Sequence, residues 1–409
     1  MFSFHRKKLN WEAGIGLLEN DVTRRQDGNA PLLERRRAPR VYLSVPVRFR
    51  FKGKVGNWEQ GESLDVSRYG IRISTLAGQI QAGTRIVLEM KLPENQDPFK
   101  LDGVVVWAKP RERMMPNHGA AQVVECGVSF EDPKKVSHMG KVLSFLTDKL
   151  CQFALERSKK LDVRPVRSLE EMKIAYRLVY DQYALKGYCE PNDAGLFYTY
   201  YCVLPESQAF LLYDKGRLLG TLTLIPDSPC GLPMEAVFQD VVARFRRPGR
   251  KLAEVSLLAL DLKAFEKKSF SLTDFEKLSA AFKLFKAMYD YARQAAGVTD
   301  LMITMHPKHQ GLYQYLKFET IGDVRSYSSA CNKPALPMHQ DMVYVTEHVS
   351  SQGGVGSYFL REGASAEKFA ERYRWNQNSA REFLKIIRPL WDKIPSEHQL
   401  HLRRCYPSL

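Results

Sequence analysis

The sequence lacks any long hydrophobic run. Its first twenty residues, MFSFHRKKLNWEAGIGLLEN, include early basic residues but no apolar core of the length that a signal peptide needs. No other stretch approaches the roughly 20 apolar residues of a membrane-spanning helix. Cysteine is scarce, with seven residues that never occur as CxxC. This argues against a zinc site or a disulfide framework and favours buried thiols in a reducing compartment. We therefore expect a soluble cytoplasmic protein without a membrane span.

Acidic residues are in the minority. The chain has 61 Lys and Arg against 46 Asp and Glu, a formal net charge of +15. The excess is concentrated at the start, where residues 1–60 hold 13 basic and six acidic side chains. A basic balance points to anionic partners. The basic residues are not interleaved with aromatic residues on one element, so we expect no nucleic acid among these partners.

The hydropathy pattern predicts a barrel in the first part of the chain. Residues 1–33 are polar and aperiodic, and we expect them to form an N-terminal extension. Residues 34–132 contain six short segments in which apolar, often β-branched residues alternate with polar ones. Six strands at this spacing favour a small closed antiparallel β-barrel, because closure leaves no exposed edge. The segments are VYLSVPVRFRF, GESLDVS, GIRISTL, TRIVLEMKL, FKLDGVVVWA and AAQVVECGVSF.

The pattern changes after the barrel. Residues 133–160 are expected to form a helix and a linker, residues 161–348 alternate helical and strand periods, and residues 349–409 predict a helical C-terminal tail. At 409 residues the chain has the length of two to three domains. The fold class is therefore multidomain, a six-stranded antiparallel barrel followed by an α/β domain and a helical tail. The local signals in the α/β part are an N-cap with a capping box (Ser168, Glu171), a hairpin turn at Asp214-Lys215-Gly216, and Gly297 after a long helix.

An arginine cluster precedes the first strand. The stretch ERRRAPRVYL contains four arginines that repel one another, and such a run is most often a solvated surface. About 25 residues later, DVSRYG places Asp65, Ser67 and Gly70 at D-x-S-x-x-G spacing between two strands. Asp and Ser are also the residues of an ordinary turn, so this alternative stays open.

The two motifs together resemble the PilZ domain, a bacterial receptor module for cyclic di-GMP, from about Glu34 to Phe130. The resemblance implies that Arg36 and Arg40 form the RxxxR pair, with Arg35 auxiliary. Forked arginine donors suit both phosphate oxygens and the O6/N7 edge of guanine. The remaining ligand contacts are assigned to Asp65 as acceptor from guanine N–H groups, to Ser67, and to Gly70, which lets the strand pass close to the ligand or adopt positive φ.

Residues 163 to about 345 resemble the N-acyl amino acid synthases, relatives of the acyl-homoserine-lactone synthases with an acetyltransferase-like fold. The stretches that carry this are RLVYDQYA, GTLTLIPDSPCGLPMEAVF, LAEVSLLALD and HPKHQGLYQYLKFETIGDVRSYSSACNKPALPMHQDM. The resemblance implies transfer of an acyl chain from a thioester to a small amine or amino acid.

The candidate catalytic residue is Glu254, in AEVSLLALD. It matches the glutamate of the E-x-S motif of the lactone synthases, which implies a role in amine positioning or as general base. The alternative is an outward-facing strand carboxylate in a salt bridge. Leu257 and Thr223 stand where the lactone synthases carry arginines, so we do not expect a lactone product.

The donor is expected to be an acyl carrier protein. Enzymes of this fold that use acetyl-CoA have a glycine-rich turn at the start of the long helix, and the corresponding segment KAFEKKSFSLTDFEKL has no glycine. The basic run formed by Arg244, Arg246, Arg247, Arg250 and Lys251 is a candidate docking surface for an acidic carrier, and equally a solvated loop. We expect no metal, since HPKH has a proline and no third ligand. The hypothesis is a cyclic di-GMP-regulated N-acyltransferase. The alternative is a non-catalytic cyclic di-GMP effector whose second domain only mediates protein interaction.

Overall fold

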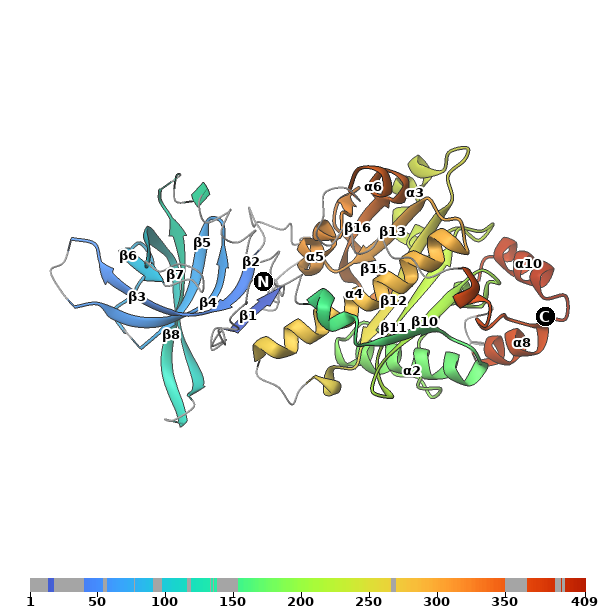
Figure 1. Cartoon of the computed structure of the whole chain (residues 1–409), viewed down its shortest axis with the longest axis horizontal. Helices are drawn as coiled ribbons and strands as arrows, with labels where there is room; N and C mark the ends of the chain where they lie inside the picture. Colours follow the sequence, from blue (N-terminus) through green and yellow to red (C-terminus); the bar gives the residue numbers. More distant parts are fainter. Residues whose placement is uncertain are drawn as a thin grey trace, which may run out of the picture. The chain divides into compact units, whose positions relative to one another are not determined.

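The computed structural model of the chain describes residues 14–17, 40–53, 57–76, 78–90, 98–115, 119–132, 134, 136–137, 154–265, 270–349, 366–386, 391 and 394–409. For residues 14–17, 40–44, 113–115, 119–121, 270–275, 308, 311, 315, 349 and 385–386 it describes the backbone alone. The chain divides into two compact units (Figure 1). Much of the expected helix after the barrel, residues 138–153, lies outside the described residues.

The first unit is built on a closed ring of six antiparallel strands. The ring runs β4-β3-β6-β7-β8-β5 and closes where β5 pairs again with β4, which confirms the predicted barrel. Two further strands continue from β4 outside the ring, β2 on β4 and β1 on β2. The strands are β1 Gly14–Leu17, β2 Arg40–Ser44, β3 Pro46–Phe51, β4 Glu59–Ser67, β5 Gly70–Thr75, β6 Arg85–Met90, β7 Phe99–Met115 and β8 Gly119–Phe130.

The first predicted strand, VYLSVPVRFRF, is interrupted at Val45. Both halves, β2 and β3, pair with β4, but at different places along it. Ser63 on β4 holds the break, because its Oγ accepts from the N–H of Val45 (2.9 Å) while its own N–H donates to the carbonyl of Val45 (2.9 Å). The interruption places Arg40 opposite Ser67, at the far end of β4.

The barrel interior is filled by the alternate residues of its strands. Successive side chains of a strand point to opposite faces, so one face of each strand supplies the core and the other meets solvent. The core includes Val47 and Phe49 of β3, Ile71 and Ile73 of β5, Ile86 and Leu88 of β6, and Cys126 and Val128 of β8.

The second unit is a mixed α/β sheet. Its strand order is β14-β16-β13-β12-β11-β10-β9, with β15 paired to β16. The pairing of β12 with β13 is parallel and the others are antiparallel, which confirms the predicted α/β class. The strands are β9 Asp162–Pro165, β10 Gln208–Asp214, β11 Arg217–Pro226, β12 Leu252–Leu260, β13 Asp300–Met305, β14 Glu319–Thr320, β15 Arg325–Tyr327 and β16 Lys333–Asp341.

The local signals of this unit behave largely as predicted. Ser168 Oγ accepts from the N–H of Glu171 (3.2 Å) and begins α2. The carboxylate of Glu171 accepts from the N–H of Arg167 and binds Arg164, in place of the capping-box contact with the N-cap N–H. The helices are α2 Leu169–Leu185, α3 Glu235–Val242, α4 Phe270–Gln294, α5 Gln310–Tyr315, α6 Met342–Val349, α8 Gln377–Ile386 and α10 Ser396–Cys405, with the 3₁₀ turns η1 Tyr200–Val203 and η6 Ala366–Phe369.

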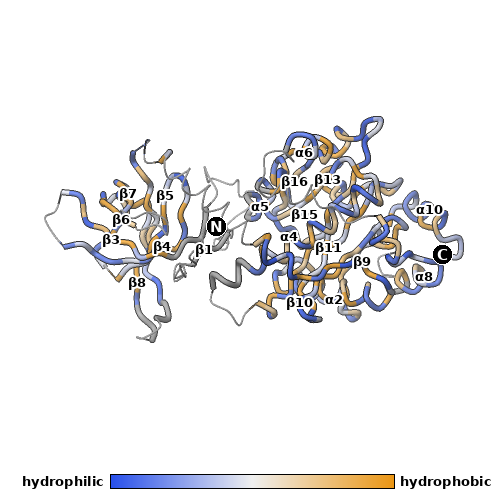
Figure 2. The backbone as a smooth tube through the Cα atoms, viewed as in Figure 1, coloured by the Kyte–Doolittle hydropathy of each residue, from blue (hydrophilic) through white to orange (hydrophobic). Residues whose placement is uncertain are grey.

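The C-terminal segment belongs to the core of the second unit. Figure 2 shows α10 as largely hydrophilic, yet Leu402 is fully buried within it. The phenol of Tyr198 donates to the carbonyl of Phe383 on α8 (2.7 Å), and the phenol of Tyr406 donates to the carbonyl of Val203 (2.6 Å). These residues share one hydrophobic cluster with α2. The helices that the sequence set apart as a tail therefore complete this core.

Candidate functional site

In the barrel, the carboxylate of Asp65 is buried and paired. The residue is 4% exposed, and its Oδ2 lies 2.7 Å from Nε of Arg72 on the neighbouring strand β5. Arg72 also approaches Glu125 on β8 (3.9 Å). Asp65, the candidate acceptor of the guanine N–H groups, is therefore paired with Arg72. The sequence did not predict this arginine.

Ser67 and Gly70 form the turn between β4 and β5. Ser67 Oγ accepts from the N–H of Tyr69 (3.3 Å) and donates to the carbonyl of Gly70 (3.2 Å), so Ser67 makes the turn that the alternative interpretation expects. Gly70 is required by close packing: a Cβ at this position would lie 2.4 Å from the carbonyl oxygen of Val128. The close neighbour of Gly70 is thus the backbone of β8, and the φ of Gly70 is not positive as the sequence had allowed.

The arginine motif is described in part. Arg35 and Arg36 lie outside the described residues, and Arg40 is described by its backbone alone. The Cα register of β2 and β4 pairs Arg40 with Ser67. The last arginine of the cluster and the serine of DVSRYG are therefore directly opposite each other on paired strands.

A row of outward-facing residues crosses the barrel beside this motif. Cα pairing links Asp65 to Arg72, Arg72 to Gly127, and Gly127 to Trp107. The indole of Trp107 lies over Gly127, since a Cβ there would be 2.3 Å from Nε1 of Trp107. An aromatic ring next to an arginine can stack on a nucleobase. The sequence alone did not single out Trp107. The available signal was Gly127 in CGVSF, because a strand glycine can mark a place where a large side chain of the next strand packs on the backbone.

In the second unit, Glu254 is buried at the centre of the sheet. It lies on β12 between β11 and β13 and is 3% exposed, so the interpretation as an outward-facing carboxylate is wrong. Its Oε2 accepts from the backbone N–H of Met234 (2.7 Å). Burial raises the pKa of the carboxyl to about 8, the Met234 N–H opposes that rise, and the like charge of Glu235 adds to it.

Three phenols lie near Glu254. Tyr183 comes from α2, Tyr201 from η1 and Tyr327 from β15. Burial raises the pKa of each phenol, and the charge of Glu254 contributes to each rise. The carboxylate therefore sits among neutral hydroxyl-bearing rings, a setting in which it can accept a proton from an amine.

The two central strands part next to Glu254. β12 and β13 pair from Leu252 with Asp300 to Val255 with Ile303. Beyond this point, in the part of the chain that the structure describes, β12 continues on β11 and β13 continues on β16. Leu257 marks the change with a left-handed backbone (φ 51°) and a register shift against β11. In this region β12 and β13 no longer pair with each other.

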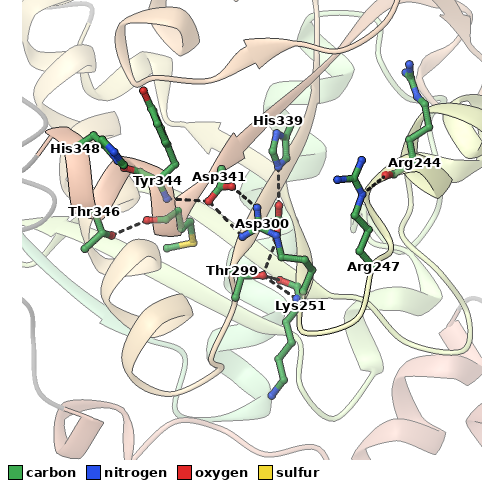
Figure 3. Close-up of polar contacts among 12 residues, drawn as sticks. Arg244, Arg247, Lys251, Thr299, Asp300, His339, Asp341, Tyr344, Thr346 and His348 are labelled. Carbon is green, nitrogen blue, oxygen red and sulfur yellow. Dashed lines mark hydrogen bonds and ion pairs between the residues drawn. The ribbon is translucent and has the colours of Figure 1, made fainter.

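The basic run before β12 is only partly available to a partner. Arg246 pairs with Asp227 and Glu235, and Arg250 pairs with Asp341 and Asp300. Arg244, Arg247 and Lys251 stay exposed. Figure 3 shows Arg247 bonded to the carbonyl of Arg244 and both arginines outside the contacts of Asp300 and Asp341. Among the described residues no group of His, Cys, Asp and Glu is arranged to hold a metal ion.

Two family models match separate parts of the chain. Residues 34–148 match the PilZ domain, and residues 174–341 match the N-acyl amino acid synthase FeeM. The chain joins a PilZ-like barrel to an FeeM-like domain. The predicted resemblance to both families is thereby confirmed.

Three solved structures are similar to parts of the chain. The FeeM-like domain is similar to FeeM, an N-acyl amino acid synthase from uncultured soil microbes, with 27% identity over 47% of this chain and 97% of that chain (TM-score 0.39). It is also similar to BjaI, a CoA-dependent acyl-homoserine lactone synthase, with 13% identity over 54% of this chain and 98% of that one (TM-score 0.37). The PilZ-like barrel is similar to the PilZ domain of YcgR from Escherichia coli, with 16% identity over 29% of this chain and 96% of that one (TM-score 0.25).

No curated protein matches the chain. None of the helices in the described residues has the length and apolar character needed to cross a membrane.

Proposed function

We propose that this protein is a cyclic di-GMP-binding N-acyltransferase. The PilZ-like barrel binds the nucleotide, and the FeeM-like domain transfers an acyl chain from a carrier-protein thioester to a small amine or amino acid. The observation that carries the proposal is the buried carboxylate of Glu254, whose pKa is about 8, beside the point where β12 and β13 part.

The proposed chemistry assigns one proton transfer to Glu254. Its carboxylate accepts a proton from the acceptor's ammonium group, and the free amine nitrogen then attacks the thioester carbonyl carbon. The new C–N bond forms and the C–S bond breaks. The attacking nitrogen loses its second proton to the leaving thiolate of the carrier, and Glu254 releases the proton it accepted to solvent. A base with a pKa near the working pH is suited to this step.

The proposed donor is supported by the connection after β12. A CoA-type pyrophosphate needs backbone N–H groups or cations to hold it, and residues 261–275 contain no glycine that would let the backbone curl around one. The proposed place for the extended, amide-containing arm of a carrier is the point where β12 and β13 part. The exposed Arg244, Arg247 and Lys251 have the charge that an acidic carrier would meet.

Calorimetric titration with cyclic di-GMP tests the barrel. Arg36→Ala and Arg40→Ala should each weaken binding by about 1.5–3 kcal/mol, since each removes a charge-assisted fork. Arg37→Ala is the matched control, because it removes an arginine from the same cluster that has no assigned ligand contact. An absence of binding by the unaltered chain, or equal losses in all three variants, would contradict specific recognition.

Mass spectrometry of products tests the chemistry. The purified chain is supplied with acyl carrier protein or acyl-CoA and a mixture of amino acids. Turnover should depend on the carrier-bound donor and fall by roughly 10²-fold or more in Glu254→Gln. Equal use of acyl-CoA would refute the carrier assignment. Intact nucleotide binding without any N-acyl product would favour the non-catalytic effector.

A further inference from the structure

Arg246 joins two carboxylates that lie at the ends of one loop. Its Nε and Nη2 contact Asp227 Oδ2 and Oδ1 (2.8 and 2.9 Å), directly after β11. Its Nη1 donates to Glu235 Oε2 (2.7 Å) in the first turn of α3, and its Nη2 also contacts Oε1. All three guanidinium nitrogens are therefore used, and the loop 228–234 is closed at both ends by one side chain.

The enclosed loop carries the hydrogen bond to Glu254. Gly231 turns it with positive φ (70°), and the N–H of Leu232 donates to Glu235 Oε1 (2.6 Å). The phenol of Tyr327 donates to the carbonyl of Pro233 (3.1 Å). At the next residue, the N–H of Met234 donates to Glu254 Oε2. The position of this donor follows from the position of the loop ends.

We propose that Arg246 is a positioning residue for Glu254: by holding Asp227 and Glu235 together it keeps the Met234 N–H on the Glu254 carboxylate. What the carboxylate then does rests on the proposed function, whereas the positioning does not. The sequence placed Arg246 in a docking run for an acidic carrier. Its contacts with two carboxylates leave this cluster with a net negative charge, which disfavours that role.

The charges around Glu254 give the proposal a signed consequence. Glu235 of α3 faces it as a like charge, and the phenols of Tyr183 (α2), Tyr201 (η1) and Tyr327 (β15) are neutral. Arg246 offsets Glu235 and holds the loop. Loss of Arg246 therefore disfavours the charged carboxylate, while loss of the Glu235 charge favours it.

Two readouts on the full-length chain test this. The first is the pH dependence of kcat/KM for acyl transfer, which reports the base in the free enzyme. The second readout needs no turnover. Each variant is compared with a double variant that also carries Glu254→Gln, and the difference between their free energies of unfolding is measured as a function of pH. This difference reports the protonation of Glu254. In both, Arg246→Ala should move the midpoint up by about one pH unit and Glu235→Gln should move it down. Arg246→Lys should fall between Arg246→Ala and wild type, because it keeps the charge without the fork.

Arg325→Ala is the matched control. Arg325 of β15 makes a two-pronged pair with Asp240 of α3 (2.6 and 2.8 Å) and donates to the carbonyl of Val237 on that helix (2.8 Å). Its side chain is 38% exposed against 36% for Arg246. This variant should leave the midpoint unchanged. A shift as large as that of Arg246→Ala, or shifts in the same direction for Arg246→Ala and Glu235→Gln, would overturn the positioning role. A midpoint for Arg246→Lys equal to that of wild type would show that the charge alone acts and would also overturn it. Opposite shifts in stability, with Arg246→Lys between wild type and Arg246→Ala but without any acyl transfer, would support the positioning and refute the proposed function.

Discussion

Replacing Glu254 by glutamine should remove a pH dependence from the stability of the second unit. The ordinary pKa of a glutamate is 4.5, and burial raises that of Glu254 to about 8. Between these values the folded state keeps a proton that the unfolded chain has released. Unfolding therefore releases a proton, and the free energy of unfolding falls as pH rises. Glutamine has no such dependence.

The magnitude follows from the size of the shift. At about 1.4 kcal/mol per pKa unit, a rise from 4.5 to about 8 corresponds to at most about 5 kcal/mol. From about pH 5 to about pH 8, wild type should lose about 3 kcal/mol relative to Glu254→Gln. The amide adds donors to a buried site, and this cost is the same at every pH. The prediction therefore concerns the slope and not the offset.

Hydrogen exchange of β12 is a suitable assay. Peptides that cover Leu252–Leu260 report the opening of the second unit without interference from the barrel. Exchange is measured in wild type and in Glu254→Gln from about pH 5 to about pH 8, with each rate corrected for intrinsic chemistry at that pH. A stability difference that stays constant over this range would refute the raised pKa and with it the assignment of Glu254 as a base.

Three further changes test the fold. Gly70→Ala should lower the melting temperature of the barrel, since overpacking against the Val128 carbonyl costs about 1–3 kcal/mol; an unchanged melting temperature in near-UV circular dichroism would contradict the close approach of β5 and β8. Gly216→Ala should lower the free energy of unfolding in urea by about 1 kcal/mol. The added methyl group would meet no neighbouring atom, so the cost comes only from the positive φ of 80°, which strains an alanine backbone. Glu89→Gln should destabilise the barrel at neutral pH. Burial alone would raise the pKa of Glu89, but bonds from Lys100 and Arg48 lower it, so the difference from wild type should shrink as pH falls through that pKa.

Much of the fold could be predicted because it depends on local patterns. The six barrel strands follow from alternation, and the hairpin after Asp214 follows from Gly216, which accepts the positive φ (80°) of this turn. The break at Val45 could not be predicted in this way. It depends on Ser63, a residue that is distant in sequence and belongs to another strand. The alternation of VYLSVPVRFRF continues through the break unchanged.

The candidate site shows the same limit. Glu254 was found from its motif, but its burial depends on β11 and β13 on either side of it, which periodicity within one strand does not reveal. Similarly, five basic residues within one short segment look alike in sequence. Asp227, Glu235 and Asp341 separate Arg246 and Arg250 from the others. These partners lie directly after β11, on α3 and on β16.

The packing of α8 and α10 has a consequence for synthesis on the ribosome. Domains generally fold as units in the order in which they are made, and the strands of the barrel ring have all been translated by Phe130. The core of the second unit begins with α2 but requires Phe383, Leu402 and Tyr406, more than two hundred residues later. Until these emerge, β10 to β12 can pack on α2, but the part of the cluster that α8 and α10 cover stays open. We therefore expect the nascent FeeM-like domain to depend on chaperones over this interval, whereas the barrel completes its fold early.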